Sequence, residues 1–402
     1  MGSAFNWTRE LGPARLVLGT TVGALVGIGL LVAFILLRRT YRRRYFRRRD
    51  ARAFAIRQQW SEIMSGAVPP ETWRFDPMDR EIVETILLNT MEVATAADIP
   101  GLLRLLRFSG LLDMRIYEAQ VSRGWRRQRA LVSLGRMRAP EAIPALTEAL
   151  DDTDTKTRAA AVRGLGRTGL LEAARQILER MVAGRLRMPA APVQIALVNC
   201  CRSQPELLLP YLRRAEGETR ELLARVLGEL ATPDMVDDLL LLAGDPLPEV
   251  RASTARALGE AKPGLALRVL SALARDPEWF VRLRAVAALG GLEDPRAIPA
   301  LVEALCDANR YVRLRAAASL VRLDLHLEEV LERVVETRDS YALQALVSEL
   351  ERSGQIRKLV DRLSDPARRD TGAEFLLDAL RAGSQQLRNA TATALKPEEV
   401  IG

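Results

Sequence analysis

Apolar residues recur along most of the chain with the spacing of an α-helix, and the predicted helices come in pairs. The clearest pair occupies residues 278–308. In a first helix over about residues 279–289, Val281, Ala285 and Leu289 fall three or four apart and share one face. A Gly-Gly pair then ends the helix, and an Asp-Pro pair provides a capping residue and a first-turn proline for a second helix. The pattern therefore predicts a helical hairpin.

The hairpin recurs with a period of 31 residues. Leu289 has counterparts at whole multiples of that period, namely Leu134, Leu165, Leu227, Leu258 and Leu320. An arginine stands seven residues before each of these six leucines, at Arg127, Arg158, Arg220, Arg251, Arg282 and Arg313. An aspartate stands six residues before four of the arginines, at Asp152, Asp245, Asp276 and Asp307. A fixed period of this length predicts an all-α fold, in which stacked hairpins form a solenoid.

The residues of this unit resemble the HEAT repeat, in the short bacterial form named after the phycobiliprotein lyases. The resemblance is carried by Val281-Arg282, Ala287-Ala288-Leu289-Gly290, Ala297-Ile298-Pro299-Ala300-Leu301 and Asp307. It implies an all-helical superhelix over residues 124–339. It implies no particular chemistry, because the family includes enzymes, enzyme subunits and scaffolds.

The chain divides by composition and pattern into seven segments. We predict an extracytoplasmic tail at 1–15, a transmembrane helix at 16–37, an arginine-rich juxtamembrane helix at 38–62, a linker at 63–78, degenerate capping repeats at 79–123, HEAT-like repeats at 124–339, and degenerate helical repeats with a tail at 340–402.

Residues 16–37 contain no charged side chain. A helix of that length, at about 1.5 Å per residue, spans the roughly 30 Å hydrocarbon layer of a membrane. A signal peptide and a buried core helix are the alternatives. The basic start and cleavage site of a signal peptide are not evident, and the arginines that follow argue against a core helix. Because these arginines crowd the C-terminal side, the positive-inside rule predicts an N-terminus outside and a solenoid in the cytoplasm. The resemblance to a bacterial form of the repeat implies that the membrane is the inner membrane of a bacterium.

Two features of this region suggest contacts in the membrane. Eight arginines beside the span would meet anionic lipid headgroups of the cytoplasmic leaflet, or they serve only to set the topology: Arg38, Arg39, Arg42, Arg43, Arg44, Arg47, Arg48 and Arg49. Gly19, Gly23 and Gly27 lie four apart on one face of the span and form a helix-pairing motif, or reflect the abundance of glycine in membrane helices. Self-association through the span is therefore one prediction.

The net charge of +8 is concentrated in one short segment. Residues 38–60 hold ten arginines and one aspartate, and the first 37 residues add one further positive charge, which leaves −2 over residues 61–402. A solenoid close to neutrality lacks the basic surface of a nucleic-acid-binding superhelix. We therefore expect no nucleic-acid partner.

The repeated arginines and aspartates predict a structural ladder rather than a catalytic site, because an active site does not need six copies of one residue. We expect each arginine to bond an aspartate or a helix-end carbonyl of the adjoining repeat. The residues concerned are Arg251, Arg282, Arg313, Asp245, Asp276 and Asp307.

Candidate partner-binding residues lie at two kinds of position. Trp125, Phe280 and Tyr311 stand two residues before a ladder arginine, where an aromatic side chain is either an exposed anchor or packing for the helix start. The second helices usually line the inner surface of such a solenoid. Their acidic residues, among them Glu303, Glu329 and Glu332, then favour a basic peptide, unless they simply suit a wet helix face.

Little in the chain favours catalysis. One histidine, His326, and three cysteines, Cys200, Cys201 and Cys306, offer no metal-ligand spacing. We expect no cofactor, metal or catalytic residue, and a non-enzymatic, membrane-anchored scaffold that binds a protein partner. A subunit of a bilin-lyase-like enzyme is the alternative that the resemblance leaves open, and a nucleic-acid-binding superhelix is a third.

Overall fold

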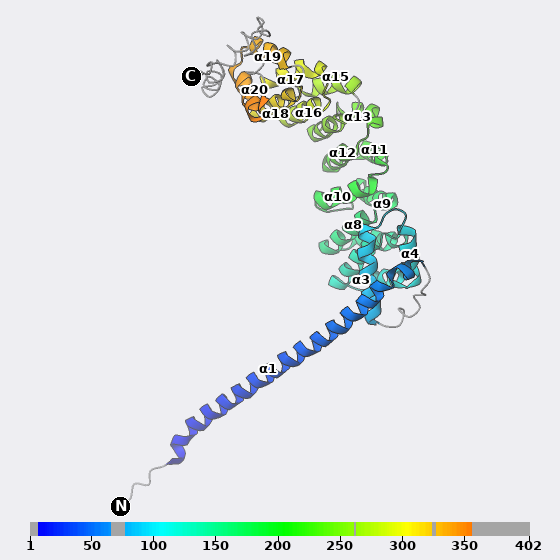
Figure 1. Ribbon diagram of the computed structural model, residues 1–402, viewed down its shortest axis with the longest axis vertical. Coiled ribbons are helices and arrows are strands. Elements are labelled where there is room, and N and C mark those ends of the chain that lie inside the picture. Colours follow the sequence, from blue (N-terminus) through cyan, green and yellow to red (C-terminus); the bar gives the residue numbers. More distant parts are fainter. Residues whose placement is uncertain (1–6, 66–76, 261–262, 324–326, 356–402) are drawn as a thin grey trace, which may run out of the picture. The chain divides into compact units, whose positions relative to one another are not determined.

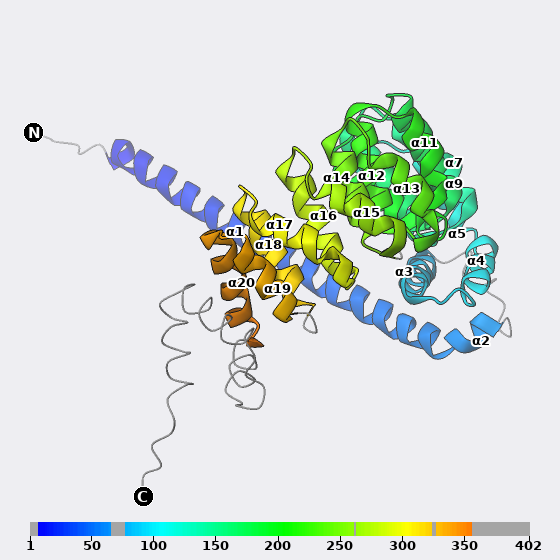
Figure 2. The same cartoon turned by 90° about the horizontal axis from the view of Figure 1, so that it is seen from above.

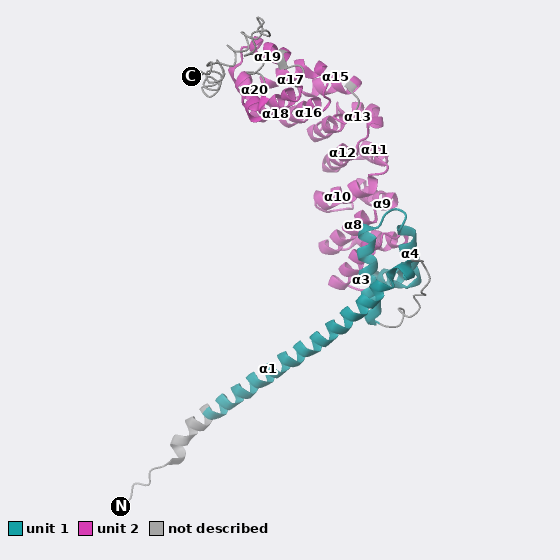
Figure 3. Cartoon of the chain, in the orientation of Figure 1, with its two compact units in different colours: residues 1–121 teal, residues 122–402 magenta. Residues whose placement is uncertain are grey.

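The computed structural model describes residues 7–65, 77–260, 263–323 and 327–355, and within those ranges every regular element is a helix. The all-α prediction is therefore confirmed. The chain forms two compact units, unit 1 at residues 1–121 and unit 2 at residues 122–402 (Figure 3). Most of the predicted linker, His326 and the helices predicted after residue 355 lie outside the described residues.

Unit 1 is built on one long helix (Figure 1). Its helices are α1 (Trp7–Gln58), α2 (Trp60–Ser65), α3 (Pro77–Val93), α4 (Ile99–Phe108) and α5 (Leu111–Val121). The predicted span lies within α1, and the arginine-rich segment continues the same helix without interruption as far as Gln58. The last residues of the predicted juxtamembrane helix, 59–62, lie beyond α1, and Trp60 begins α2. Within the described part of the chain, α1 is the one helix that is long and apolar enough to cross a membrane, and its apolar window is fully exposed.

The C-terminal end of α1 is fixed to α3. The guanidinium of Arg52 donates to both carboxylate oxygens of Asp79, with Nε–Oδ1 and Nη2–Oδ2 distances of 2.9 and 2.7 Å. Arg49 forms a longer ion pair with Glu81, at 3.8 Å. Ile56 in α1 is buried. Apolar burial and a bidentate bond together hold α1 against the helices that follow it.

A buried ion pair joins α3 to α5 inside unit 1. Arg115 donates from Nε to Glu84 Oε1 at 2.7 Å, and it also bonds Glu118. Both Arg115 and Glu84 are less than one-tenth exposed. The hydrogen bond that Arg115 donates to Glu84 raises the pKa of Arg115 above its ordinary value, against the opposing effect of burial. Loss of Arg115 would leave the buried Glu84 without this ion pair, so the pair fixes how α3 and α5 meet.

Unit 2 alternates first and second helices of successive hairpins. The first helices are α6 (Gly124–Met137), α8 (Thr155–Thr168), α10 (Ala190–Cys201), α12 (Gly217–Leu230), α14 (Pro248–Leu258), α16 (Trp279–Gly291), α18 (Arg310–Val321) and α20 (Ser340–Arg352). The second helices are α7 (Ile143–Glu148), α9 (Leu171–Val182), α11 (Leu208–Arg214), α13 (Val236–Leu242), α15 (Pro263–Leu273), α17 (Ile298–Leu305) and α19 (Leu327–Glu336). Short 3-10 turns lead into several of the second helices. The predicted solenoid is confirmed.

The first helices form the inner layer of unit 2 and the second helices form the outer layer. In Figure 1 the stack curves so that α10, α12, α16 and α18 lie inside the bend, with α11, α13, α15 and α17 outside it. The view from above separates α12 and α14 from α9 and α11 in the same way (Figure 2). The expectation that second helices line the inner surface is therefore wrong for this chain.

Small residues explain why the first helices take the inside of the bend. A Cβ added at Gly135 would lie 2.4 Å from the Cα of Gly164, and one added at Gly290 would lie 2.2 Å from Oγ of Ser319. These helices approach so closely that a side chain would not fit. The outer layer is looser, because a groove of about 570 Å³ lies between α7 and α9, lined by Ile143 and Leu171 among others. A stack that is tight in one layer and open in the other curves toward the tight layer.

Candidate protein-binding surface

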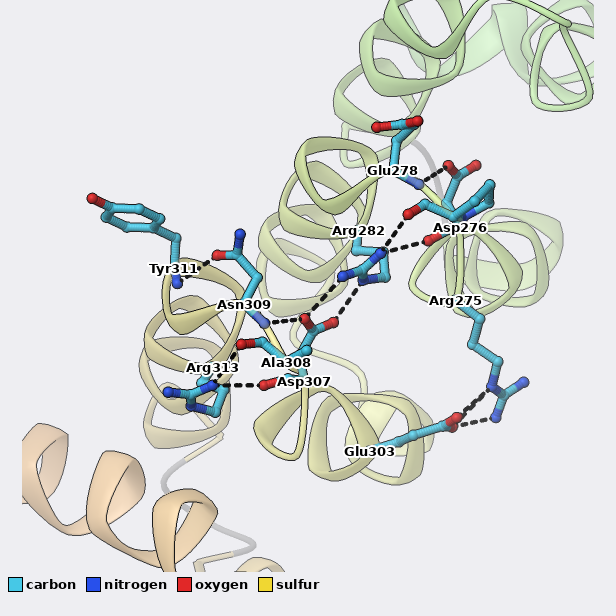
Figure 4. Close-up of polar contacts among 11 residues, drawn as sticks. Arg275, Asp276, Glu278, Arg282, Glu303, Asp307, Ala308, Asn309, Tyr311 and Arg313 are labelled. Carbon is cyan, nitrogen blue, oxygen red and sulfur yellow. Dashed lines mark hydrogen bonds and ion pairs between the residues drawn. The ribbon is translucent and has the colours of Figure 1, made fainter.

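A ladder of arginines and aspartates runs along one edge of unit 2. Arg282 donates from Nε to Asp307 Oδ2 at 2.6 Å and from Nη2 to Asp307 Oδ1 at 3.0 Å (Figure 4). Its Nη1 also donates to the backbone carbonyls of Asp276 and Pro277, at 2.8 and 2.9 Å. One guanidinium thus joins the turn before its own helix to the aspartate of the next repeat.

The same connection recurs at a separation of 25 residues. The pairs are Arg127–Asp152, Arg220–Asp245, Arg251–Asp276 and Arg282–Asp307. Each aspartate also accepts a bond from a backbone amide two residues on, as Asp307 does from Asn309 at 2.7 Å. Each aspartate therefore caps its own turn and receives the arginine of the preceding repeat.

The ladder lowers the pKa of two of its aspartates, Asp276 and Asp307. Burial by itself would raise the pKa of Asp276, but hydrogen bonds from Arg251 and the Glu278 amide outweigh it and lower that pKa. The pKa of Asp307 is lowered in the same way, against burial, by Arg282 and the Asn309 amide. These bonds are made within the chain. The ladder therefore holds neighbouring repeats together, and its side chains are not available to a ligand.

The ladder ends at Arg313, and an aromatic surface lies beside its end. Arg313 still donates to the carbonyls of Asp307 and Ala308, at 2.7 and 3.1 Å. In place of an aspartate, its guanidinium faces the ring of Tyr341, 5.7 Å from the ring centroid. A cation over a ring is attracted to it.

The predicted aromatic anchors lie at the starts of first helices. Trp125 and Tyr311 are each 64 % exposed, and Phe280 is half-buried. Trp279 and Tyr341, which the sequence pattern did not single out, are also exposed, at 41 and 67 %. The rings of Trp279 and Tyr311 lie 6.1 Å apart between centroids, so the aromatic surface continues from α16 to α18. Trp125 lies on α6 and belongs to another part of the array.

The inner layer is basic where this aromatic surface lies. Neither α16 nor α18 contains an acidic residue, and exposed arginines stand on both, at Arg284, Arg310 and Arg315. Within the described ranges, none of these three side chains forms an ion pair. The helices α6 and α8 at the other end of the array also contain arginine and lysine but no acidic residue. The inner surface is thus not the acidic groove that the sequence predicted.

The predicted acidic residues lie on the outer layer. Glu303 in α17 accepts a bond from Nε of Arg275 at 2.8 Å, and this bond lowers the pKa of Glu303 (Figure 4). Glu329 in α19 forms an ion pair with Arg333 at 3.1 Å, and Glu332 is exposed. The acidic residues that the sequence pattern singled out therefore lie on the outer layer, although the inner helices α12 and α14 also carry glutamates.

A groove opens between α18 and α20 on the inner layer. It has a volume of about 320 Å³, and its lining includes Arg310, Arg313, Leu314, Tyr341 and Ala345. Leu314 is itself 41 % exposed. Apolar atoms and two guanidinium groups therefore meet in one hollow.

The membrane-facing candidates lie on α1. Arg38, Arg39, Arg42, Arg43, Arg44, Arg47 and Arg48 are all exposed, whereas Arg49 is half-buried beside α3. Nothing lies within 4 Å of a Cβ added at Gly19, Gly23 or Gly27, so this face of α1 is open. The arginines surround the helix immediately beyond its apolar segment.

The described cysteine and acidic side chains bear on two kinds of site, a metal site and a reactive thiol. Among the described residues, no group of three or more histidine, cysteine, aspartate and glutamate side chains is placed to hold a metal ion. Burial raises the pKa of the Cys200 thiol to about 11 and that of Cys201 to about 12, so both are protonated at neutral pH. The absence of catalysis stays a prediction.

Sequence reasoning missed the exposed face of α16 and α18. The signal was present: Trp279, Leu283 and Ala287 fall four apart on the face opposite the buried Val281 and Leu289. The net charge of residues 61–402 concealed the positive charge of α6, α8, α16 and α18, because it averages over both layers.

Comparison with known proteins identifies the repeat. A family model described as HEAT repeats matches residues 122–188, 205–282 and 266–351. No curated protein matches. Similar solved structures include an engineered protein (18 % identity, 80 % of this chain and 95 % of that one, TM-score 0.40) and the E. coli protein YIBA (15 %, 78 % and 96 %, 0.35). Human deoxyhypusine hydroxylase is also similar (17 %, 62 % and 100 %, 0.27). At these TM-scores, the three likenesses carry no argument about function.

Proposed function

The chain belongs to the HEAT-repeat family, and from that premise we propose that it is a membrane-tethered scaffold whose inner surface binds a protein partner. The observation that carries the proposal is the combination of α1, apolar and exposed over its membrane-length window, with a solenoid that presents exposed aromatic side chains. Exposed aromatic and arginine side chains are typical of protein-binding hot spots.

The tether is supported by the composition of α1. An exposed apolar segment of this length is stable in a hydrocarbon layer and not in water. The arginines that follow favour the cytoplasmic side, with the solenoid in the cytoplasm and the N-terminus outside. Anionic headgroups would attract them, at about 1 kcal/mol for each residue near the surface. A tether raises the effective concentration of a bound partner near the membrane.

Pairing of α1 through Gly19, Gly23 and Gly27 is part of the same proposal. Glycines at this spacing allow two helix backbones to approach closely. A dimer would present two solenoids side by side and would raise the avidity for a partner with two binding segments. The scaffold needs no cofactor and performs no reaction of its own.

The tether is tested in cells with two variants of the full chain. We expect Leu25→Arg/Ile28→Arg to release the protein from the membrane fraction, because two charges at the centre of a span oppose insertion. The matched control, Leu241→Arg/Leu265→Arg, places the same charges on exposed positions of α13 and α15 and should leave the protein in the membrane fraction. If both variants resisted extraction with alkaline carbonate as the unaltered chain does, α1 would not be the anchor.

A further inference from the structure

The inner surface of the last repeats has a composition unlike the rest of unit 2. We call it the aromatic–arginine strip, and it consists of Trp279, Phe280 and Arg284 on α16, Arg310, Tyr311, Leu314 and Arg315 on α18, and Tyr341 on α20. Three consecutive first helices contribute to it. The strip belongs to a single layer of a single unit, so its members are placed by the same stacking that forms the ladder.

Apolar surface is left uncovered along this strip. Tyr311 and Tyr341 are about two-thirds exposed, and Trp279 and Leu314 are each 41 % exposed. The contact between the rings of Trp279 and Tyr311 joins two repeats into one surface. Large exposed side chains that cluster in this way mark a binding site more often than isolated ones do.

Positive charge without a partner accompanies the apolar surface. Arg313 uses Nη1 on two backbone carbonyls, but Arg284, Arg310 and Arg315 have no ion pair among the described residues. The helices α16 and α18 contain no acidic side chain. Glu229 in α12 and Glu249 in α14 line one hollow together with Arg284, so the excess positive charge of the strip lies mainly at Arg310 and Arg315. The strip therefore attracts carboxylates, which guanidinium groups bind in a bidentate manner.

We propose that the aromatic–arginine strip binds an acidic segment of a partner protein, in which aromatic or aliphatic side chains alternate with carboxylates. This proposal rests on the scaffold function proposed above and specifies its partner. An apolar side chain of the segment enters the groove between α18 and α20, against Leu314 and Tyr341, and a flanking carboxylate meets Arg310. Other apolar side chains lie on Trp279 and Tyr311.

The layout of charge favours a protein segment over a nucleic acid. Along the same inner layer, α12 and α14 contribute Glu218, Glu221 and Glu249, which interrupt the positive surface between the strip and α8. A phosphate backbone would meet these carboxylates as it followed the layer. A short acidic segment fits within the three helices of the strip and avoids them.

The test uses the full chain in lipid nanodiscs and a displayed library of random 16-residue peptides. We expect the enriched peptides to be acidic and to contain aromatic or aliphatic residues. The affinity of the best peptide, measured by fluorescence anisotropy, should fall about tenfold in Tyr311→Ala and at least as much in Arg315→Glu. Tyr117→Ala in α5 and Arg268→Glu in α15 are the matched controls, both at exposed positions outside the strip, and should bind as the unaltered chain does.

Several results would overturn the proposal. Enrichment of basic peptides would overturn it. Unchanged peptide affinity in both strip variants, with thermal unfolding showing that the variants are folded, would also overturn it. A fluorescent oligo(dT) that bound with the same sensitivity to both variants would replace the protein segment with a nucleic acid. If deletion of residues 356–402 raised peptide affinity more than tenfold, the chain's own C-terminal segment would be the occupant.

The outcome also separates this proposal from the scaffold function. Peptides that no longer bind the Glu303→Lys/Glu332→Lys variant, but still bind the strip variants, would place the partner on the outer layer. The proposal for the strip would then be wrong, and the scaffold function would remain. A screen that enriched no peptide at all would count against both, and only the membrane tether would then remain to be judged by its own test.

Discussion

The two layers of unit 2 are built by the same 31-residue pattern but have opposite properties. First helices pack so closely that glycine or serine is needed between them, and the ends of their layer expose arginines. Second helices stand further apart, with a groove between α7 and α9, and carry the acidic residues Glu303, Glu329 and Glu332. Repeated residues thus determine the curvature, while the residues that differ between repeats determine what each surface can bind.

The ladder consists of repeated residues that stabilise the stack and do not contribute to binding. Its loss should therefore have the largest effect on the stability of unit 2. Asp276→Ala removes the partner of Arg251 and the cap of the Glu278 amide, at a site where both side chains are mostly buried. We expect a loss of about 3 kcal/mol in the free energy of unfolding. Urea denaturation would measure it, and hydrogen exchange would locate the loss at α14 and α16.

Asp238→Ala is the control for the ladder variant. Asp238 pairs with Arg213 across the outer layer at 3.0 Å, but the arginine side chain is 65 % exposed. We expect a change of less than about 1 kcal/mol. Equal losses in the two variants would mean that the ladder is no more important than an ordinary surface ion pair.

Adjacent glycines test the tight packing of the inner layer. A methyl group at Gly290 would collide with Ser319 on α18, whereas one at Gly291 would meet only the Gly259 carbonyl oxygen, 4.0 Å away. We expect Gly290→Ala to destabilise unit 2 by about 1 to 3 kcal/mol. Gly291→Ala should be neutral or slightly stabilising, because alanine favours a helix. Thermal unfolding of both variants would decide, and the same melting temperature in each would refute the close approach.

Acid should weaken the ladder. The pKa values of Asp276 and Asp307 are lower in the folded chain than their ordinary value of 3.8. Their contribution to stability is therefore complete above that value and is lost as the pH falls below it toward the lower, folded pKa. Urea midpoints measured at pH 2–5 should fall with acid, and fall less in Arg282→Gln. An identical slope in the variant would show that the pair is not coupled to folding.

The smallest effect is expected on the outer layer. Glu303→Gln removes an ion pair with Arg275, whose side chains are 62 and 52 % exposed. Solvent screens such a pair, so we expect little change in stability and none in binding to the strip. A marked loss of peptide affinity in this variant would contradict the division of roles between the layers.

Much of the fold could be predicted because it depends on repeated positions. Leu289 and its counterparts are buried, and their spacing alone indicates a stack of hairpins. The spacing of Arg282 and Asp307 similarly indicated residues that meet in the structure. The pair Arg115 and Glu84 was not predicted, since unit 1 has no repeat that would relate α3 to α5.

The candidate surface was predictable only in part. Trp125, Phe280 and Tyr311 could be singled out because their shared position is readable from the repeat, and their role in binding stays a prediction. The inner layer was assigned to the wrong helices, because curvature depends on which layer packs closer, and that follows from contacts such as Gly290 against Ser319. Once the layers are exchanged, the expected charge of the partner changes from basic to acidic.

The continuity of α1 has a mechanical consequence. Eleven residues, 38–48, separate the end of the apolar segment from Arg49. Arg49 is the first residue of α1 that forms an ion pair with α3. Each helical residue adds about 1.5 Å of rise and about 100° of rotation. The length of this spacer therefore sets both the height of α3 above the membrane and the direction in which it faces. With the tether in a bilayer, one inserted residue would rotate α3, which is docked on α1, by about 100° around the axis of α1. Seven would lift it by about 10 Å yet return it almost to its original heading.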